Sequence, residues 1–121
     1  MSNKKVLVLG ASENPARYSY LAANRLLESG YNPILVSNRE GAIRGIPFFT
    51  HWPAEKGVDT ITLYLNPKNQ EPYINSILES QPKRVIFNPG TENMDFYNRL
   101  VDNGIEAINA CTLVMLSTGQ F

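Results

Sequence analysis

The sequence predicts a single α/β domain of three layers, in which helices cover both faces of an open, mostly parallel sheet. Residues 5–9, Lys-Val-Leu-Val-Leu, are suited to a buried strand, and a strand that is apolar on both faces belongs in a parallel sheet covered on both sides. Short apolar runs then alternate with helical patterns, as right-handed crossovers between parallel strands require. Gly10 directly follows the first strand and permits a sharp turn there.

Composition narrows the class of protein. The 121 residues suffice for one domain with one core. Lys plus Arg and Asp plus Glu each number 11, so no basic excess is present to bind a nucleic-acid backbone. One cysteine excludes an internal disulfide framework and fits a reducing compartment. No apolar run is as long as a membrane span, and residues 1–5 do not resemble a signal peptide. We therefore expect a cytoplasmic protein.

The first part of the chain has the pattern of a βαβ unit. Apolar residues at four-residue spacing predict a helix over 18–29. Gly30 stands where a left-handed helix cap belongs. A strand over 33–36 follows, and it ends at Ser37-Asn38-Arg39.

The rest of the chain continues the alternation of strands and helices. We predict a short strand over 46–49, at the edge of the sheet because Pro47 disfavours a central position, and a turn or short helix over 52–56. The other predicted elements are strands over 60–65, 84–87 and 105–109, helices over 72–80 and 93–103, and a terminal helical turn over 112–116. The predicted sheet order is the short edge strand, the second strand, the first strand, and then the strands that begin at 60, 84 and 105.

The predicted sheet also locates a ligand site. The chain reverses direction across the sheet between the first strand and the strand at 60, and open α/β sheets bind ligands outside the carboxyl strand ends at such a reversal. The residues expected there are Gly10, Ala11, Ser12, Asn38, Arg39, Tyr64, Leu65, Asn88, Pro89 and Gly90.

The first turn and the end of the second strand restrict the type of nucleotide. The dinucleotide fingerprint needs three glycines spaced G-x-G-x-x-G, and this chain has only the first, Gly10. The fingerprint also needs an acidic residue after the second strand, where this chain has Ser37-Asn38-Arg39. These differences argue against NAD and leave NADP, or a nucleotide with a phosphorylated ribose such as coenzyme A. The alternative is that Arg39 is a solvated loop charge.

The turn from Glu13 to Ser19 adds further candidates. Pro15 stiffens the turn, and the Ser19 hydroxyl is suited to cap the helix. For Arg17 two interpretations stay open: it meets a pyrophosphate, or it pairs with Glu13 at the surface.

The residues Gly10-Ala11-Ser12-Glu13-Asn14-Pro15-Ala16-Arg17, followed by Ser19-Tyr20 and Leu27-Glu28-Ser29-Gly30-Tyr31, resemble the small stand-alone CoA-binding proteins. These are similar to the CoA-binding domain of succinyl-CoA ligase α subunits. The resemblance implies a Rossmann-like fold with CoA, or acyl-CoA, lying across the carboxyl strand ends. It also implies that Gly10, Ala11 and Ser12 hold the phosphates, that Asn14, Pro15 and Arg17 form the following turn, and that Ser37, Asn38 and Arg39 contact the adenosine side.

Three stretches depart from the family pattern. The family's strand-ending Val-Asn-Pro corresponds to Val36-Ser37-Asn38, where asparagine and proline become serine and asparagine. The family often has an aromatic residue and then arginine after the third main strand, whereas this chain has Tyr64-Leu65-Asn66. Near its end the family often has Asp-Arg-Cys-Pro-Lys, whereas this chain has Asn109-Ala110-Cys111-Thr112-Leu113. The aromatic residue and the cysteine are kept and the cations are lost, which bears on affinity and specificity.

Catalysis has little support in the sequence. Cys111 lies at a strand end, but a thiolate nucleophile needs a nearby base or cation, and nothing in the sequence brings the single histidine, His51, close to it. One histidine and one cysteine cannot form a closed zinc site. The catalytic phosphohistidine of succinyl-CoA ligase lies on a separate domain, so the resemblance implies binding without chemistry.

Three hypotheses follow. The first is a cytoplasmic CoA- or acyl-CoA-binding protein that is not an enzyme and that binds neither metal, nucleic acid nor membrane. The second is an NADP-dependent oxidoreductase-like domain. The third is an interaction or regulatory module that kept the fold and lost the ligand. A homodimer formed through a helix or a sheet edge is left open.

Overall fold

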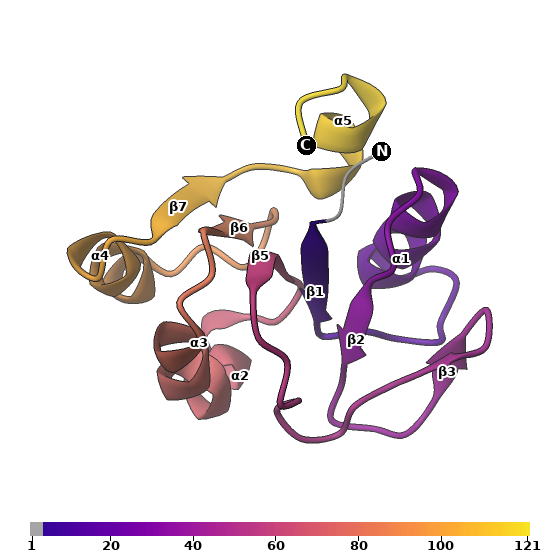
Figure 1. The fold of residues 1–121 in the computed structure, drawn as a ribbon, viewed down its shortest axis with the longest axis horizontal. Coiled ribbons are helices and arrows are strands. Elements are labelled where there is room, and N and C mark those ends of the chain that lie inside the picture. The colour runs from indigo at the N-terminus through magenta and orange to yellow at the C-terminus, as the bar shows by residue number, and fades with distance from the viewer. Residues whose placement is uncertain (1–3) are drawn as a thin grey trace.

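The computed structural model describes residues 4–121, and its centre is a sheet of five parallel strands in the order β2-β1-β5-β6-β7 (Figure 1). This is the predicted order of the five main strands. The expectation about a signal peptide concerns residues 1–5, of which Met1–Asn3 lie outside the described residues. The strands are β1 (Lys5–Leu9), β2 (Ile34–Val36), β5 (Val58–Leu63), β6 (Arg84–Phe87) and β7 (Glu106–Asn109).

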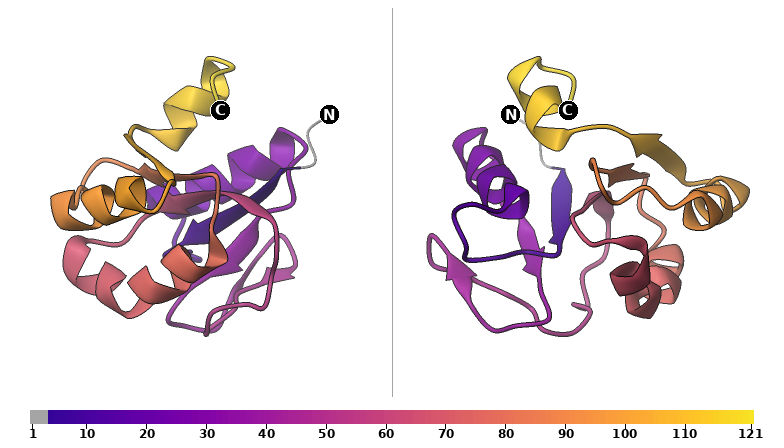
Figure 2. Two further views of the ribbon diagram at one scale, coloured as in Figure 1. Left: turned by 60° about the vertical axis from the view of Figure 1, so that its left-hand side comes forward. Right: turned by 180° about the vertical axis from the view of Figure 1, so that it is seen from behind.

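Helices cover both faces of this sheet. One face carries α1 (Tyr18–Glu28) and α5 (Thr112–Ser117), and the other carries α2 (Pro67–Gln70), the 3₁₀-helix η1 (Glu71–Tyr73), α3 (Ile74–Ser80) and α4 (Met94–Asp102) (Figure 2). The structure therefore confirms the three-layer α/β architecture.

The side chains of β1 pack into the apolar core on both faces of the sheet. Val6 and Val8 pack on the side of α1, whereas Leu7 and Leu9 pack on the side of α3 and α4, and all four side chains are fully buried. Successive side chains of a strand point to opposite faces, so an apolar run is stable only between two helical layers. Since β1 pairs in parallel with both β2 and β5, the reversal of chain direction falls beside its carboxyl end.

The predicted edge strand over 46–49 is only partly correct. Ile46–Pro47 forms β4, which pairs antiparallel with β3 (Ala42–Ile43) in a separate hairpin. Phe49 alone reaches the main sheet: its N–H donates to Leu35 O (2.8 Å), and its carbonyl accepts from Ser37 N (2.9 Å). The tight turn at Arg44 and Gly45, both with positive φ, folds the segment back on itself. Residues 52–56 contain no helix.

Two helical predictions also need correction. The helix predicted over 72–80 corresponds to α3, but α2 and η1 precede it, so the helical stretch begins at Pro67. The sequence pattern predicts that Asn66-Pro67 ends the preceding strand, whereas Asn66 is an N-cap whose side chain accepts a hydrogen bond from Asn69 N (2.9 Å). In α4 the pattern predicts Tyr97, Leu100 and Val101 inward. Leu100 is buried, Tyr97 is partly buried, and Val101 is 53% exposed, with Phe96 taking the inward position.

Candidate ligand-binding cleft

A cleft of about 1090 Å³ lies at the carboxyl ends of the strands, where the reversal predicts it. The segments that follow all five main strands line it. Of the predicted site residues, the cleft is lined by Gly10, Ala11, Ser12, Asn14, Arg17, Ser37, Asn38, Arg39, Tyr64, Leu65, Asn88, Pro89 and Gly90. Pro15 does not line it. The structure thus brings these residues to one surface, while their role in binding stays a prediction.

Gly10 has a steric reason to be glycine. Its φ is +100°, a conformation that L side chains rarely adopt. A Cβ on this residue would lie 3.0 Å from Leu65 Cδ2 and 3.2 Å from the Tyr64 carbonyl carbon. The turn after β1 therefore packs closely against the residues that follow β5, and both segments line the cleft.

The backbone amides of this turn are not all available, which corrects the simple picture of a Gly-Ala-Ser cradle. The N–H groups of Gly10 and Ala11 both donate to Val36 O, each at 2.9 Å. Among the described residues, no partner accepts from the N–H groups of Ser12 and Glu13. The N–H groups of Tyr18 and Ser19 at the start of α1 also have no acceptor among the described residues, whereas Tyr20 N donates to Arg17 O (3.1 Å). The free donors therefore belong to Ser12, Glu13, Tyr18 and Ser19 rather than to Gly10 and Ala11.

The loop from Ser12 to Arg17 is held by its own side chains. Ser12 Oγ accepts from Asn14 N (3.0 Å), Asn14 Oδ1 accepts from Ala16 N (3.0 Å), and Asn14 O accepts from Arg17 N (3.0 Å). The first two are side-chain turns, and the third closes a backbone turn. Asn14 thus shapes the approach to α1.

The predicted capping role of Ser19 is wrong. The N-cap of α1 is Arg17, without a side-chain hydrogen bond. Ser19 lies inside the helix and is buried. Within residues 4–121 the N–H groups of Tyr18 and Ser19 therefore stay unpaired, and such a helix end attracts an anion.

The two arginines of the cleft are available to a ligand. Arg17 and Arg39 are exposed, and within residues 4–121 neither forms an ion pair. The alternative in which Arg17 pairs with Glu13 is therefore wrong: Glu13 Oε2 instead accepts a hydrogen bond from Ala42 N at 3.0 Å. Ser37 Oγ accepts from Arg39 N (3.2 Å) and so orders the turn that presents Arg39.

Asn88 is a structural junction beneath the cleft. Its Nδ2 donates to Thr62 Oγ1 (2.7 Å) and to Leu63 O (2.8 Å), and its Oδ1 accepts from Thr112 N (2.9 Å). The Thr62 and Thr112 hydroxyls are 2.8 Å apart and bonded to each other. Because Asn88 is 3% exposed and its side-chain amide already has three partners, the amide fixes the ends of β5 and β6 against α5.

Gln70 connects the turns that follow β5 and β6, a role that the sequence analysis did not predict. Its Nε2 donates to Leu65 O and Thr91 O, both at 2.8 Å, and its Oε1 accepts from Asn93 Nδ2 at 2.9 Å. The side chain is fully buried. It joins the turn after β5 to the turn after β6, and both turns line the cleft.

Tyr64 contributes a buried hydroxyl at the end of β5. The hydroxyl oxygen has no hydrogen-bond partner among the described residues. Burial raises the pKa of this phenol above its ordinary value of 10.0, and the nearby Thr62 and Thr112 hydroxyls oppose that effect. The residue therefore stays neutral at physiological pH.

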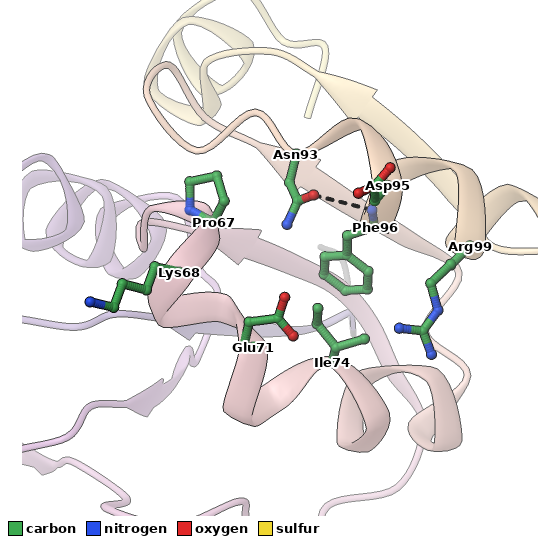
Figure 3. Close-up of a pocket in the computed structure, with 8 residues that line it drawn as sticks. All are labelled: Pro67, Lys68, Glu71, Ile74, Asn93, Asp95, Phe96 and Arg99. Atoms are coloured by element: carbon green, nitrogen blue, oxygen red, sulfur yellow. Dashed lines mark hydrogen bonds between the residues drawn. The ribbon is translucent and has the colours of Figure 1, made fainter.

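A second hollow of about 400 Å³ lies between α2, η1, α3 and α4 (Figure 3). The Phe96 ring and Ile74 form its apolar part, and the Asn93 side chain caps α4 by accepting from Phe96 N (3.2 Å). Its charged lining has both signs, from Lys68, Glu71, Asp95 and Arg99. It lacks the glycine turn of the main cleft, so the main cleft is the better phosphate site.

The groups considered for catalysis do not converge. Cys111 lines the cleft and is partly buried, whereas His51 does not line it. Within residues 4–121, no three His, Cys, Asp or Glu side chains are grouped so as to hold a metal ion. Within the same range, no helix has both the length and the apolar character needed to span a bilayer.

Comparison with known proteins identifies the family. The model of a CoA-binding domain matches residues 4–117. The chain belongs to this CoA-binding domain family. A search of curated proteins found no match.

Solved structures agree with that family assignment. A crystal structure of an uncharacterized protein is 50% identical, with a TM-score of 0.96, and each chain is covered fully. A conserved hypothetical protein from Pyrococcus furiosus is 27% identical, with 92% of this chain and 97% of that chain covered and a TM-score of 0.79. A protein from Thermus thermophilus, at 21% identity, covers 98% of this chain and 90% of its own with a TM-score of 0.86, which shows the shared Rossmann-like fold. The CoA-binding domain family thus accounts for nearly the whole chain.

Proposed function

We propose that this protein binds coenzyme A or an acyl-CoA in the main cleft and performs no chemistry on it. The observation that carries the proposal is the cleft itself. A glycine turn, the residues Ser12 and Glu13, whose N–H groups have no acceptor among the described residues, and the start of α1 all line this cleft at the carboxyl edge of the sheet. Such an arrangement suits a pyrophosphate.

The charged side chains suggest how the ligand lies. In parallel α/β sheets the ribose lies beside the end of the second strand, which here is followed by Ser37, Asn38 and Arg39. An exposed arginine that has no ion pair within residues 4–121 suits a phosphorylated ribose at that point. The pantetheine arm would then extend past Leu65 towards Asn88 and Cys111, along the segments that continue the cleft.

The absence of a catalytic role is part of the proposal. Cys111 has no histidine beside it in the cleft, and thiol catalysis needs a base or cation to form the thiolate. We accordingly propose a carrier, a sensor or a regulatory subunit that acts in the reducing environment of the cytoplasm. Incubation with acetyl-CoA should release no free thiol above the background rate, and a protein-dependent release would contradict this part of the proposal.

A ligand panel tests binding directly. Thermal unfolding is measured with CoA, acetyl-CoA, 3′-dephospho-CoA, NADP, NAD and ATP. A ligand that binds only the folded state at a hundred times its Kd adds about 2.7 kcal/mol to the free energy of unfolding. We expect a rise in Tm with CoA and acetyl-CoA, and a smaller one with 3′-dephospho-CoA. A rise in Tm with NADP alone would favour a redox role. If no nucleotide raises Tm, the remaining hypothesis is an interaction or regulatory module that does not bind the ligand.

A further inference from the structure

Glu13 makes a long-range contact that ties the two sides of the cleft entrance together. Its Oε2 accepts a hydrogen bond from Ala42 N at 3.0 Å. The contact joins the loop after β1 to the start of β3, 29 residues further along the chain. Both Glu13 and the neighbouring Phe48 line the cleft. We call the group of Glu13, Gly41, Ala42 and Phe48 the Glu13 clasp.

Gly41 shows how closely the clasp is packed. A Cβ on Gly41 would lie 2.8 Å from Glu13 Cδ and 2.9 Å from Phe48 Cε2, closer than real Cβ contacts. Gly41 O also accepts from Phe48 N at 2.8 Å. The Glu13 side chain therefore lies across the backbone of Gly41, and only glycine leaves room for it.

The Glu13 clasp lies at the end of the cleft next to β2, the edge strand of the sheet. The segment that it fastens follows Ser37–Glu40, which line the cleft beyond β2. It fixes how far the loop with the free Ser12 and Glu13 N–H groups lies from the turn with Arg39. A bond between a carboxylate and a backbone N–H is stronger than a neutral one, so a single side chain can hold this spacing.

We infer that Glu13 is a positioning residue for the adenosine end of the ligand. The inference rests on the proposed function, because it assigns to CoA the orientation proposed above. Glu13 acts through the backbone of Ala42 and leaves the pantetheine end unaffected. It is therefore expected to set affinity for the nucleotide half of CoA without changing affinity for the other half.

Three variants test the clasp by isothermal titration calorimetry. Glu13→Ala removes the acceptor and should weaken CoA binding about tenfold, the size of one charge-assisted hydrogen bond. Glu13→Gln keeps an acceptor and should stay within about threefold of the parent protein. Gly41→Ala should match Glu13→Ala, because its methyl group displaces the flexible carboxylate end. The double variant should bind no more than about twofold more weakly than either single variant, since both remove one contact.

Two ligand fragments separate positioning from a general loss of structure. Adenosine 3′,5′-bisphosphate should lose affinity with Glu13→Ala, and 4′-phosphopantetheine should not. Glu28→Ala is the matched control. Glu28 also fastens the β3–β4 hairpin, through Arg44 Nη2 at 3.2 Å, but it does not line the cleft. Its removal should leave CoA affinity unchanged.

The outcomes distinguish the clasp from the proposed function. If the parent protein binds no CoA, the proposed function fails. If the parent binds CoA and Glu13→Ala binds it equally well, the clasp alone is overturned. Equal losses for both fragments, or additive losses in the double variant, also overturn it. Gly41→Ala carries the same test if Glu13→Ala does not fold.

Discussion

The side-chain oxygen of Asn88 accepts a hydrogen bond from the backbone N–H of Thr112, 2.9 Å away, and this bond joins the end of β6 to the first residue of α5. The same amide group donates to Thr62 and to Leu63 O in the neighbouring strand. The sequence places Asn88 among the ligand-binding residues. In the structure Asn88 lines the cleft, and its side-chain amide holds the floor of the cleft through these three hydrogen bonds.

Replacing Asn88 should therefore act on stability first. Asn88→Ala leaves buried donors and acceptors without partners and should lower the free energy of unfolding by about 3 kcal/mol. Urea denaturation measures the loss. Asn98→Ala is the control, because Asn98 is exposed on α4, and it should cost less than about 0.5 kcal/mol. Equal effects of the two substitutions would show that the junction is energetically unimportant.

Removing the Tyr64 hydroxyl, in contrast, should not lower the free energy of unfolding. The hydroxyl is buried without a hydrogen-bond partner among the described residues, so Tyr64→Phe removes a group that is costly to bury. We expect a free energy of unfolding that is unchanged or higher by up to about 1 kcal/mol. Chemical denaturation at pH 7 measures it. A loss of more than about 1 kcal/mol would show that the Tyr64 hydroxyl forms a stabilising hydrogen bond with the nearby Thr62 or Thr112 hydroxyl.

Tyr64 should also affect stability at alkaline pH. Burial raises the pKa of Tyr64 in the folded state above its ordinary value of 10.0. Above pH 10 the unfolded chain therefore releases the phenol proton while the folded chain keeps it, and stability falls as the pH rises. Below that pH the group has no such effect. Between pH 10 and 11 the free energy of unfolding should fall less in Tyr64→Phe than in the parent protein. Tyr18→Phe is the control, because Tyr18 is 69% exposed, and this substitution should leave the size of the fall unchanged.

Gly10→Ala tests the close approach between β1 and β5. The substitution combines a positive φ with contacts to Leu65 and Tyr64 near 3 Å, and should lower the free energy of unfolding by about 2–3 kcal/mol. Gly30→Ala is a matched control, since Gly30 has a φ of +92° but nothing within 4 Å of its Cβ position. The difference between the two variants measures the crowding alone. If both lose the same amount, crowding against Leu65 contributes nothing.

Arg39→Ala tests the phosphorylated ribose. Loss of one charge-assisted contact should weaken CoA binding about tenfold. The affinity for 3′-dephospho-CoA should stay nearly the same, so that the preference for CoA disappears. Calorimetry with both ligands measures this, and Arg25→Ala, outside the cleft, serves as the control. A variant that kept the full preference would remove Arg39 from the proposed site.

Much of the fold could be predicted because its signals are local. The apolar strands, the glycine after β1 and the cap at Gly30 each depend on neighbouring residues. The errors also have local causes. Asn66-Pro67 ends a strand in one context and caps a helix in another, and the structure uses it as a cap. Val101 fits the helical spacing, but the sheet edge leaves that side of α4 uncovered.

The sequence predicts where the site lies but not what each of its residues does. The carboxyl strand ends follow from topology, so most of the cleft residues could be named. Their individual roles depend on contacts between distant segments. The Glu13–Ala42 bond spans 29 residues and the Asn88–Thr112 bond spans 24. Gln70 lies in a stretch with no motif, and only the folded chain shows that it joins Leu65 to Thr91.

The hydrogen bonds of Ser12 and Asn14 within their own loop have a consequence for how a ligand would arrive. A loop already ordered by its own turns loses little conformational entropy when an anion binds. Association should then depend on diffusion and charge rather than on a slow rearrangement. Asn14, which donates and accepts within the loop and belongs to no helix or strand, would then affect the rate of ligand binding as well as the shape of the loop.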